Sequence, residues 1–153
     1  MTEPRWLDED EQRAWRAFLA ASRLLFDRLE RELQHDAGMP HAYYEILVRL
    51  SEAPDRRLRM SELADKSLSS RSRVSHAARR LEEAGWLRRE ECETDRRGAW
   101  AVLTDAGYAV LQAAAPGHVE GVRTHLFDQL SAEQVAQLRQ ISEAVVAHLE
   151  PLD

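Results

Sequence analysis

The segment between Lys66 and Leu81 holds a cluster of cationic side chains within an acidic protein. It contains five cations and no aspartate or glutamate, whereas the whole chain has a net charge of −6. Cations of this kind bind phosphate, and arginine can also donate two hydrogen bonds to the edge of a guanine. The segment is therefore a candidate surface for nucleic acid, with a merely solvated helix face as the alternative.

The predicted DNA contacts lie on one face of a helix that begins at Ser69 or Ser70. The spacing i, i+3, i+4, i+7 defines its buried face, which consists of Val74, Ala77, Ala78 and Leu81. A helix about 10–12 Å across fits the major groove, and its N-terminal half usually meets the bases. Ser70 through Arg73 are therefore expected to contact bases. The predicted surface as a whole consists of Ser69, Ser70, Arg71, Ser72, Arg73, Ser75, His76, Arg79 and Arg80.

A second cationic group lies in the polar segment 93–98, which is expected to be the loop of a β-hairpin. Arg96 and Arg97 at such a tip can enter the minor groove, which attracts arginine most strongly where A/T-rich DNA narrows it. Asp95 is expected to accept hydrogen bonds from a neighbouring arginine and to hold the loop in shape. The helix and the hairpin together predict contacts in adjacent grooves.

Other reactive side chains give weaker signals. Cys92 is the only cysteine, which excludes an internal disulfide, and a redox switch there would need an exposed thiol of lowered pKa. Histidines that could approach one another are His35, His41, His118 and His125. None of the histidines forms an i, i+4 pair, so no metal site or cofactor is predicted. Nucleophile elbows, phosphate loops and His-Glu-x-x-His are missing from the sequence, so an enzyme is not expected.

Length and composition favour one domain rich in helix. The chain has 153 residues, enough to bury a core, and only 6 glycines and 5 prolines. No run of apolar residues is long enough for a transmembrane helix, and the first residues do not resemble a signal peptide. Together with the single cysteine, these features predict a cytoplasmic protein with no membrane partner.

The periodicity of apolar residues predicts a mainly helical fold with a β-wing of two or three strands. Helices are expected at about 7–36, 40–51, 62–65, 70–84, from 105 onward and at 132–149. Strands are expected at 58–60, 86–92 and 99–103. The order short helix, turn, helix and hairpin is that of a winged helix-turn-helix, flanked here by long terminal helices.

Several polar residues and one proline predict where helices begin and end. Ser61 is expected to cap the short helix and Thr104 the helix after the wing. Ser131 and Gln134 are spaced as a capping box for the last helix. Pro116 should kink or interrupt the helix that contains it.

Three groups of residues support a family resemblance. They are Arg80-Leu81-Glu82-Glu83-Ala84-Gly85, Asp95-Arg96-Arg97-Gly98 and Leu103-Thr104-Asp105-Ala106-Gly107. Together with Gly38-Met39-Pro40 and Pro116, they make the chain resemble the MarR family of bacterial regulators over nearly its whole length. Ser75-His76 departs from the Thr-Arg more often found there, which affects the base-reading pattern and not the fold.

The resemblance implies a homodimeric repressor on a pseudo-palindromic site in double-stranded DNA. Residues 1–153 would form a single domain, with dimerisation helices at about 1–38 and 105–153 and a DNA-binding lobe at about 40–104. The sequence supports a dimer independently, because two apolar stripes at opposite ends of the chain would leave a large exposed patch if unpaired. The alternative is that both stripes fold onto one monomeric core.

The resemblance also implies release from DNA by a small molecule, often an aromatic acid, bound between the dimerisation helices and the DNA-binding lobe. Aromatic and ionisable residues suited to a phenol or carboxylate are Trp15, His41, Tyr43 and Tyr44. Ordinary core packing is the alternative for each of them. The alternative function is a winged helix that contacts only protein and does not bind DNA.

Overall fold

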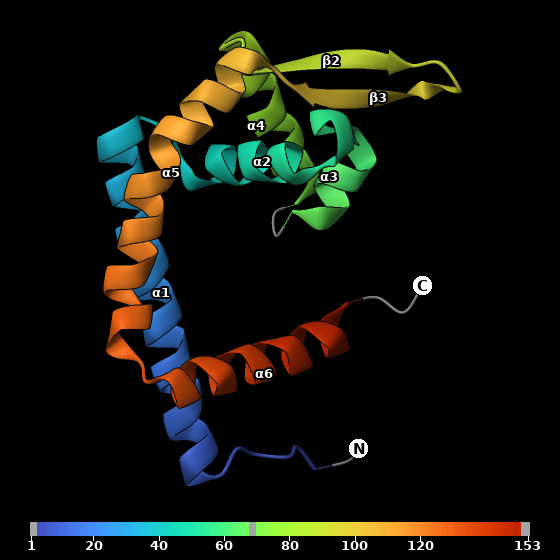
Figure 1. Ribbon diagram of the computed structural model, residues 1–153. Coiled ribbons are helices and arrows are strands. Elements are labelled where there is room, and N and C mark those ends of the chain that lie inside the picture. The colour runs from blue at the N-terminus through green and yellow to red at the C-terminus, as the bar shows by residue number, and fades with distance from the viewer. Residues whose placement is uncertain (1–2, 68–69, 151–153) are drawn as a thin grey trace. The chain divides into compact units, whose positions relative to one another are not determined.

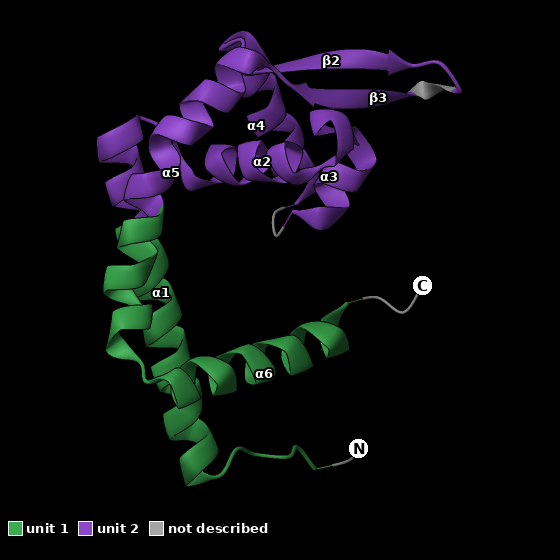
Figure 2. Cartoon of the chain, viewed as in Figure 1, with its two compact units in different colours: residues 1–28, 119–153 green, residues 29–118 purple. Residues whose placement is uncertain are grey.

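The computed structural model describes residues 3–67 and 70–150, and for residues 95–97 it describes the backbone alone. The fold is mainly helical with a three-stranded antiparallel wing, which confirms the predicted fold class (Figure 1). The chain divides into two compact units, which are coloured separately in Figure 2. Unit 1 comprises residues 1–28 and 119–153, and unit 2 comprises residues 29–118.

Unit 2 contains the helix-turn-helix and the wing. Its elements are the end of α1 (Glu9–Ala37), α2 (His41–Glu52), the 3-10 helix η1 (Pro54–Arg56), β1 (Arg57–Arg59), α3 (Met60–Lys66), α4 (Arg71–Glu83), β2 (Leu87–Cys92), β3 (Asp95–Leu103) and most of α5 (Asp105–His125). Strand β3 lies between β1 and β2 and pairs with both. In Figure 1, β2 and β3 extend away from the helices of this unit as a long hairpin.

The core of unit 2 joins its α-helices and its three strands. Fully buried side chains come from α2, α3, α4 and the sheet, and include Leu47, Leu50, Leu63, Leu81 and Ala101. Helix α4 is thereby held against α2, α3 and the sheet along one face. The opposite face of α4 stays in solvent, which is the arrangement that a groove-binding helix requires.

Most of the predicted helix ends are confirmed. The Ser70 hydroxyl accepts a hydrogen bond from the Arg73 backbone N–H at 3.4 Å and begins α4. Thr104 accepts from the Gly107 N–H at 3.0 Å and begins α5. Ser131 and Gln134 form the expected reciprocal box at the start of α6 (Ala132–Leu149), with bonds of 2.9 and 3.2 Å.

One predicted helix cap is wrong. Ser61 does not cap α3, because the helix begins one residue earlier, at Met60. The Glu62 carboxylate instead accepts a hydrogen bond from the Arg59 backbone N–H at 3.1 Å. Helix α5 is not interrupted at Pro116, because a proline removes only one backbone donor and need not end a long helix. The expected kink there stays a prediction.

The hairpin turn is shorter than the sequence predicts. Strand β3 begins at Asp95, which pairs with Cys92 across an irregularity that follows Glu91. The backbone ladder thus extends into polar residues, because strand pairing needs main-chain donors and acceptors and no apolar side chain. The predicted loop at 93–98 is replaced by a link of two residues, Glu93 and Thr94.

Unit 1 differs from unit 2 in leaving its apolar side chains exposed. It contains most of α1, the end of α5, the 3-10 helix η2 (Phe127–Gln129) and α6. Exposed large apolar residues on its helices include Phe18, Leu19, Leu24, Ile141, Val145 and Leu149. Phe18, Leu24 and Leu138 line a groove of about 450 Å³. Among residues 3–67 and 70–150, no helix is long and apolar enough to cross a membrane.

Candidate nucleic-acid interface

Helix α4 separates its residues into a buried face and an exposed face as the sequence predicts. The buried face consists of Val74, Ala77, Ala78 and Leu81, none more than 4% exposed. The exposed face contains Ser70, Arg71, Ser72, Arg73, Ser75, His76, Arg79 and Arg80. The predicted Ser69 lies outside the described residues.

The two halves of this exposed face differ in electrostatics. In the C-terminal half, Arg79 and Arg80 both pair with Glu83, at 3.3 and 3.1 Å. In the N-terminal half, the Arg73 guanidinium has no carboxylate partner within the part of the chain that the structure describes. Arg73 is therefore available to a ligand without first breaking an ion pair.

Arg71 lies at the start of α4 and contacts the preceding helix. Its guanidinium donates to the Asp65 carboxylate at 3.0 Å, and both side chains are well exposed. Sequence inspection missed this pair, since Asp65 lies just outside the acid-free segment. An exposed pair of this kind contributes little to stability, so a phosphate can compete for the arginine.

The wing is joined to α4 and α5 at its base by a compact set of hydrogen bonds. The Thr104 hydroxyl donates to the Gly85 carbonyl at 2.7 Å, and the Thr104 backbone N–H donates to the Trp86 carbonyl at 3.2 Å. Gly85 itself has a φ of +76°, which favours glycine. A Cβ on Gly107 would lie 2.1 Å from the Trp86 carbonyl oxygen, so only glycine fits there. These contacts explain why threonine and glycine stand at positions 104 and 107 of the segment Leu103-Thr104-Asp105-Ala106-Gly107.

The tip of the wing carries the predicted minor-groove residues. Arg96, Arg97 and Asp95 form the start of β3, whereas the sequence placed them in a loop. The structure describes only the backbone of these three residues, so the roles assigned to Arg96, Arg97 and Asp95 stay predictions. The Cys92 thiol is buried and lies 3.3 Å from the Thr94 hydroxyl, at the position where the strands turn.

A further set of arginines lies on the outer face of the sheet, and sequence inspection did not single it out. The guanidinium groups of Arg57 and Arg59 lie 4.7 and 5.4 Å from the centre of the Trp100 ring. Arg56 stacks 3.7 Å from the centre of the Tyr108 ring. Such stacking restrains the arginine side chains at the edge of the wing.

The residues predicted to bind a ligand are only partly brought together. His41 and Tyr44 lie near one another in α2, with ring centres 6.3 Å apart, whereas Tyr43 packs against the hydrophobic core. Trp15 lies in unit 1, where its ring stacks on Phe18.

His118 completes the aromatic cluster with His41 and Tyr44. Its ring centre lies 4.5 Å from that of Tyr44 and 5.3 Å from that of His41. Burial raises the pKa of Tyr44, and burial followed by repulsion from His41 lowers the pKa of His118. The His118 Nδ1 atom is buried without a hydrogen-bond partner among the described residues.

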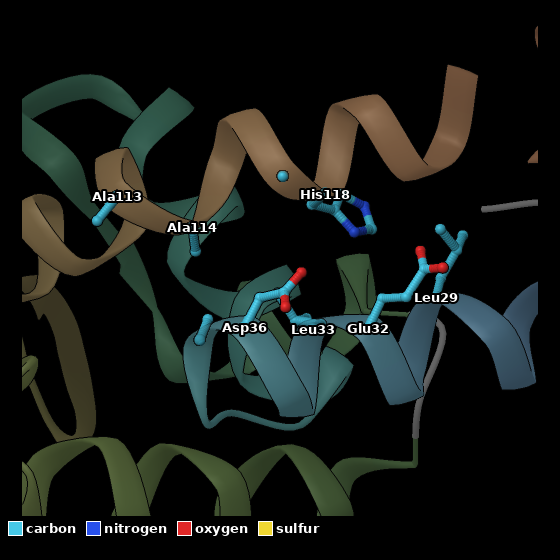
Figure 3. A pocket seen from close by; sticks show the side chains of 9 residues that line it. Leu29, Glu32, Leu33, Asp36, Ala113, Ala114 and His118 are labelled. Atoms are coloured by element: carbon cyan, nitrogen blue, oxygen red, sulfur yellow. The ribbon is translucent and has the colours of Figure 1, made fainter. Parts of the chain in front are cut away.

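A small pocket of about 60 Å³ lies beside this cluster, between α1 and α5 (Figure 3). Glu32 and Asp36 extend into it from α1, and His118 extends into it from α5. The volume is enough for water and too small for an aromatic ligand in this conformation. No group of three or more metal-ligating side chains occurs among the residues described.

Comparison with known proteins identifies a set of related regulators. The MarR family profile matches residues 37–98. The crystal structure of Sco3205, a MarR family transcriptional regulator from Streptomyces coelicolor in complex with DNA, is 54% identical and has a TM-score of 0.94. That similarity covers 97% of this chain and 93% of Sco3205.

Two further relatives support the same assignment. AbsC, a MarR family transcriptional regulator from Streptomyces coelicolor, is 45% identical with a TM-score of 0.90, over 95% of this chain and 98% of AbsC. The HTH-type transcriptional regulator PecS of Dickeya dadantii (strain 3937) is 35% identical over 89 residues, which are 58% of this chain. The match spans about half of PecS, 53% of its length.

Proposed function

We propose that this chain, which belongs to the MarR family of winged helix-turn-helix transcriptional regulators, is a homodimeric repressor that binds a pseudo-palindromic DNA site. The observation on which the proposal rests is the exposed N-terminal half of α4. Ser70, Ser72, Arg73, Ser75 and His76 present donors there on a helix whose other face is fixed in the core. The family consists of regulators and not enzymes, so the polar groups of this face bind and do not catalyse.

Base contacts come from the N-terminal half of α4, with Ser70 through Arg73 nearest to the bases. Arg73 is the arginine expected to contact a guanine, because its side chain is exposed and has no carboxylate partner among the described residues. Arg79 and Arg80 pair with Glu83 and lie further along α4, beyond the half that faces the bases. We assign them to phosphates beside the groove. Arg96 or Arg97 at the wing tip enters the adjacent minor groove, with Asp95 holding the tip in shape.

Dimerisation is assigned to the terminal helices, within one functional domain of residues 1–153. The apolar side chains exposed in unit 1 form the surface that a second copy would bury. A two-fold dimer places its two α4 helices about 34–36 Å apart, which is one turn of DNA. Residues 40–104 then form the DNA-binding lobe of each protomer.

A small-molecule effector is the finer part of the proposal. His41, Tyr44 and His118 supply a polar, aromatic cluster beside a small pocket in unit 2. A ligand there would weaken DNA binding if it bound better to a dimer whose α4 helices no longer fit successive grooves. Trp15 and Tyr43 are the further aromatic residues assigned to this function.

The decisive experiment is selection of duplex DNA by the purified protein, followed by binding measurements with Arg73→Ala and Arg97→Ala. Each substitution should weaken binding to the selected site by about 1–3 kcal/mol. Gln140→Ala, at an exposed residue of α6 away from its apolar stripe, is the control and should leave binding unchanged. A wild-type protein with no preference for any duplex would instead favour a protein-interaction module.

A further inference from the structure

A cleft of about 330 Å³ lies between α3, α4 and the base of the wing, and it shares Arg71 and Ser75 with the exposed face of α4. Four polar side chains line it, two arginines and two serines: Ser61, Arg71, Ser75 and Arg89. Its apolar lining consists of Met60, Ala64, Val74 and Ala99. No acidic side chain is among these lining residues. The cleft thus combines hydrogen-bond donors with small apolar surfaces.

The position of this cleft determines what can occupy it. Helix α4 borders it on one side and the strands of the wing border it on the other. A protein that inserts a helix into the major groove and a wing into the next minor groove must straddle one sugar–phosphate strand, because that strand separates the two grooves. We therefore propose that the cleft binds a backbone phosphate of the DNA, an inference that rests on the proposed function.

The charges in the cleft fit a phosphodiester. Arg89 pairs through its Nε with Glu82 on α4 at 3.3 Å, and its side chain is about one-third exposed, at 35%. Because both side chains of this pair are partly exposed, at 35% and 43%, a phosphate can compete with Glu82 for the Arg89 guanidinium. The Glu82 carboxylate orients the guanidinium and also competes with the incoming anion.

The lining also suits the sugar. Ser61 on α3 and Ser75 on α4 are exposed hydroxyls that line the cleft, and hydroxyls commonly donate to phosphate. Met60, Ala64 and Ala99 offer apolar contact to a deoxyribose. Ser61 therefore has a binding function in place of the helix cap that the sequence predicted.

Arg88 provides a matched control on the same strand. Side chains alternate across a sheet, so Arg88 lies on the face opposite to Arg89. It also pairs with a glutamate, Glu90, at 2.8 Å. The two arginines thus have the same side chain and a similar ion pair, and they differ in the face of the sheet on which they lie.

The test measures DNA binding of wild type, Arg89→Gln and Arg88→Gln as a function of salt, on a selected site and on an unrelated duplex. Arg89→Gln should weaken binding to both duplexes by a similar factor, about five- to tenfold. The slope of log K against log salt should fall in magnitude by about 0.9 for each protomer. Arg88→Gln should leave the affinity and the slope unchanged.

A second variant tests whether Glu82 competes with phosphate for Arg89, and it excludes misfolding as the cause of the change in affinity. Glu82→Gln should raise affinity about two- to threefold by releasing Arg89 from its partner, whereas Glu90→Gln should not. A misfolded protein cannot produce such a gain. An unchanged salt slope in Arg89→Gln, or a loss confined to the selected site, would overturn the phosphate assignment while the proposed function stands. Wild-type protein that binds no duplex would overturn both.

Discussion

The two units of the chain differ in whether their apolar side chains are buried. Within the described residues, every buried apolar side chain belongs to unit 2, and every large apolar side chain that is exposed belongs to unit 1. Unit 2 has helices on a sheet, so its elements can cover one another. Unit 1 consists of helices alone and leaves an apolar groove of about 450 Å³. The difference supports the proposal that a second copy buries the apolar surface of unit 1.

The largest expected effect comes from the core of unit 2. Leu81→Ala removes a side chain that is fully buried beneath α4, so the free energy of unfolding should fall by about 2–5 kcal/mol. Urea denaturation followed by circular dichroism measures this change. Gln140→Ala in unit 1, at an exposed polar residue of α6, is the control and should change it by less than about 0.5 kcal/mol. Equal costs for both would remove the contrast between the units.

The next effect concerns the exposed surface of unit 1. Leu24→Asp and Ile141→Asp each place a charge in the surface that a second copy would cover, where the side chains are now 68% and 63% exposed. Each should weaken dimerisation by about 2 kcal/mol or more, roughly thirtyfold in the dissociation constant. Sedimentation velocity over a concentration series measures this constant. Gln140→Asp, also on α6, is the matched control, and an oligomeric state insensitive to all three substitutions would contradict the dimer surface.

A smaller effect should come from the joint at the base of the wing. Thr104→Val keeps the volume of the side chain but removes the bonds to the Gly107 N–H and the Gly85 carbonyl. Loss of such a cap should cost about 1 kcal/mol of unfolding free energy, visible in thermal or urea denaturation. Thr124→Val, which removes only an exposed bond of 3.4 Å to Glu120, should cost clearly less. A Thr104→Val protein as stable as wild type would show that the strand pairing alone fixes the wing.

The smallest expected effect is a pH dependence of the free energy of unfolding that arises from His118, the last residue of unit 2. Burial lowers the pKa of His118 in the folded state, while the unfolded state has the ordinary value near 6.5. Below that pH the unfolded state binds a proton that the folded state binds less readily, so the free energy of unfolding should decrease as the pH falls. His118→Gln should make this decrease shallower between pH 7 and pH 5, and the exposed His148→Gln should not. Equal pH profiles for wild type and His118→Gln would show that this histidine is not buried in solution.

Much of the fold and part of the candidate site could be predicted from local patterns. The buried stripe of α4, the caps at Ser70 and Thr104 and the box at Ser131 were all predicted, because each depends on residues within seven positions of one another. Ser61 was placed wrongly, since Glu62 satisfies the same chain end from inside the helix.

The parts that could not be predicted depend on pairing between elements. The start of β3 at Asp95 follows from its register with β2 and is not visible in the polarity of residues 95–98. His118 was considered only as a metal ligand, and its approach to Tyr44 depends on the packing of α5 against α2.

The sequence by itself determined the order of the elements, the apolar and cationic faces of α4 and the family resemblance, because these are properties of short segments with fixed geometry. Only the tertiary structure decided which arginines are paired with acids, that Arg89 joins α4 to the wing, and that unit 1 leaves its apolar side chains uncovered. The physical reason is distance. Ion pairs and burial depend on how far apart segments lie in space after folding, which a local pattern does not contain.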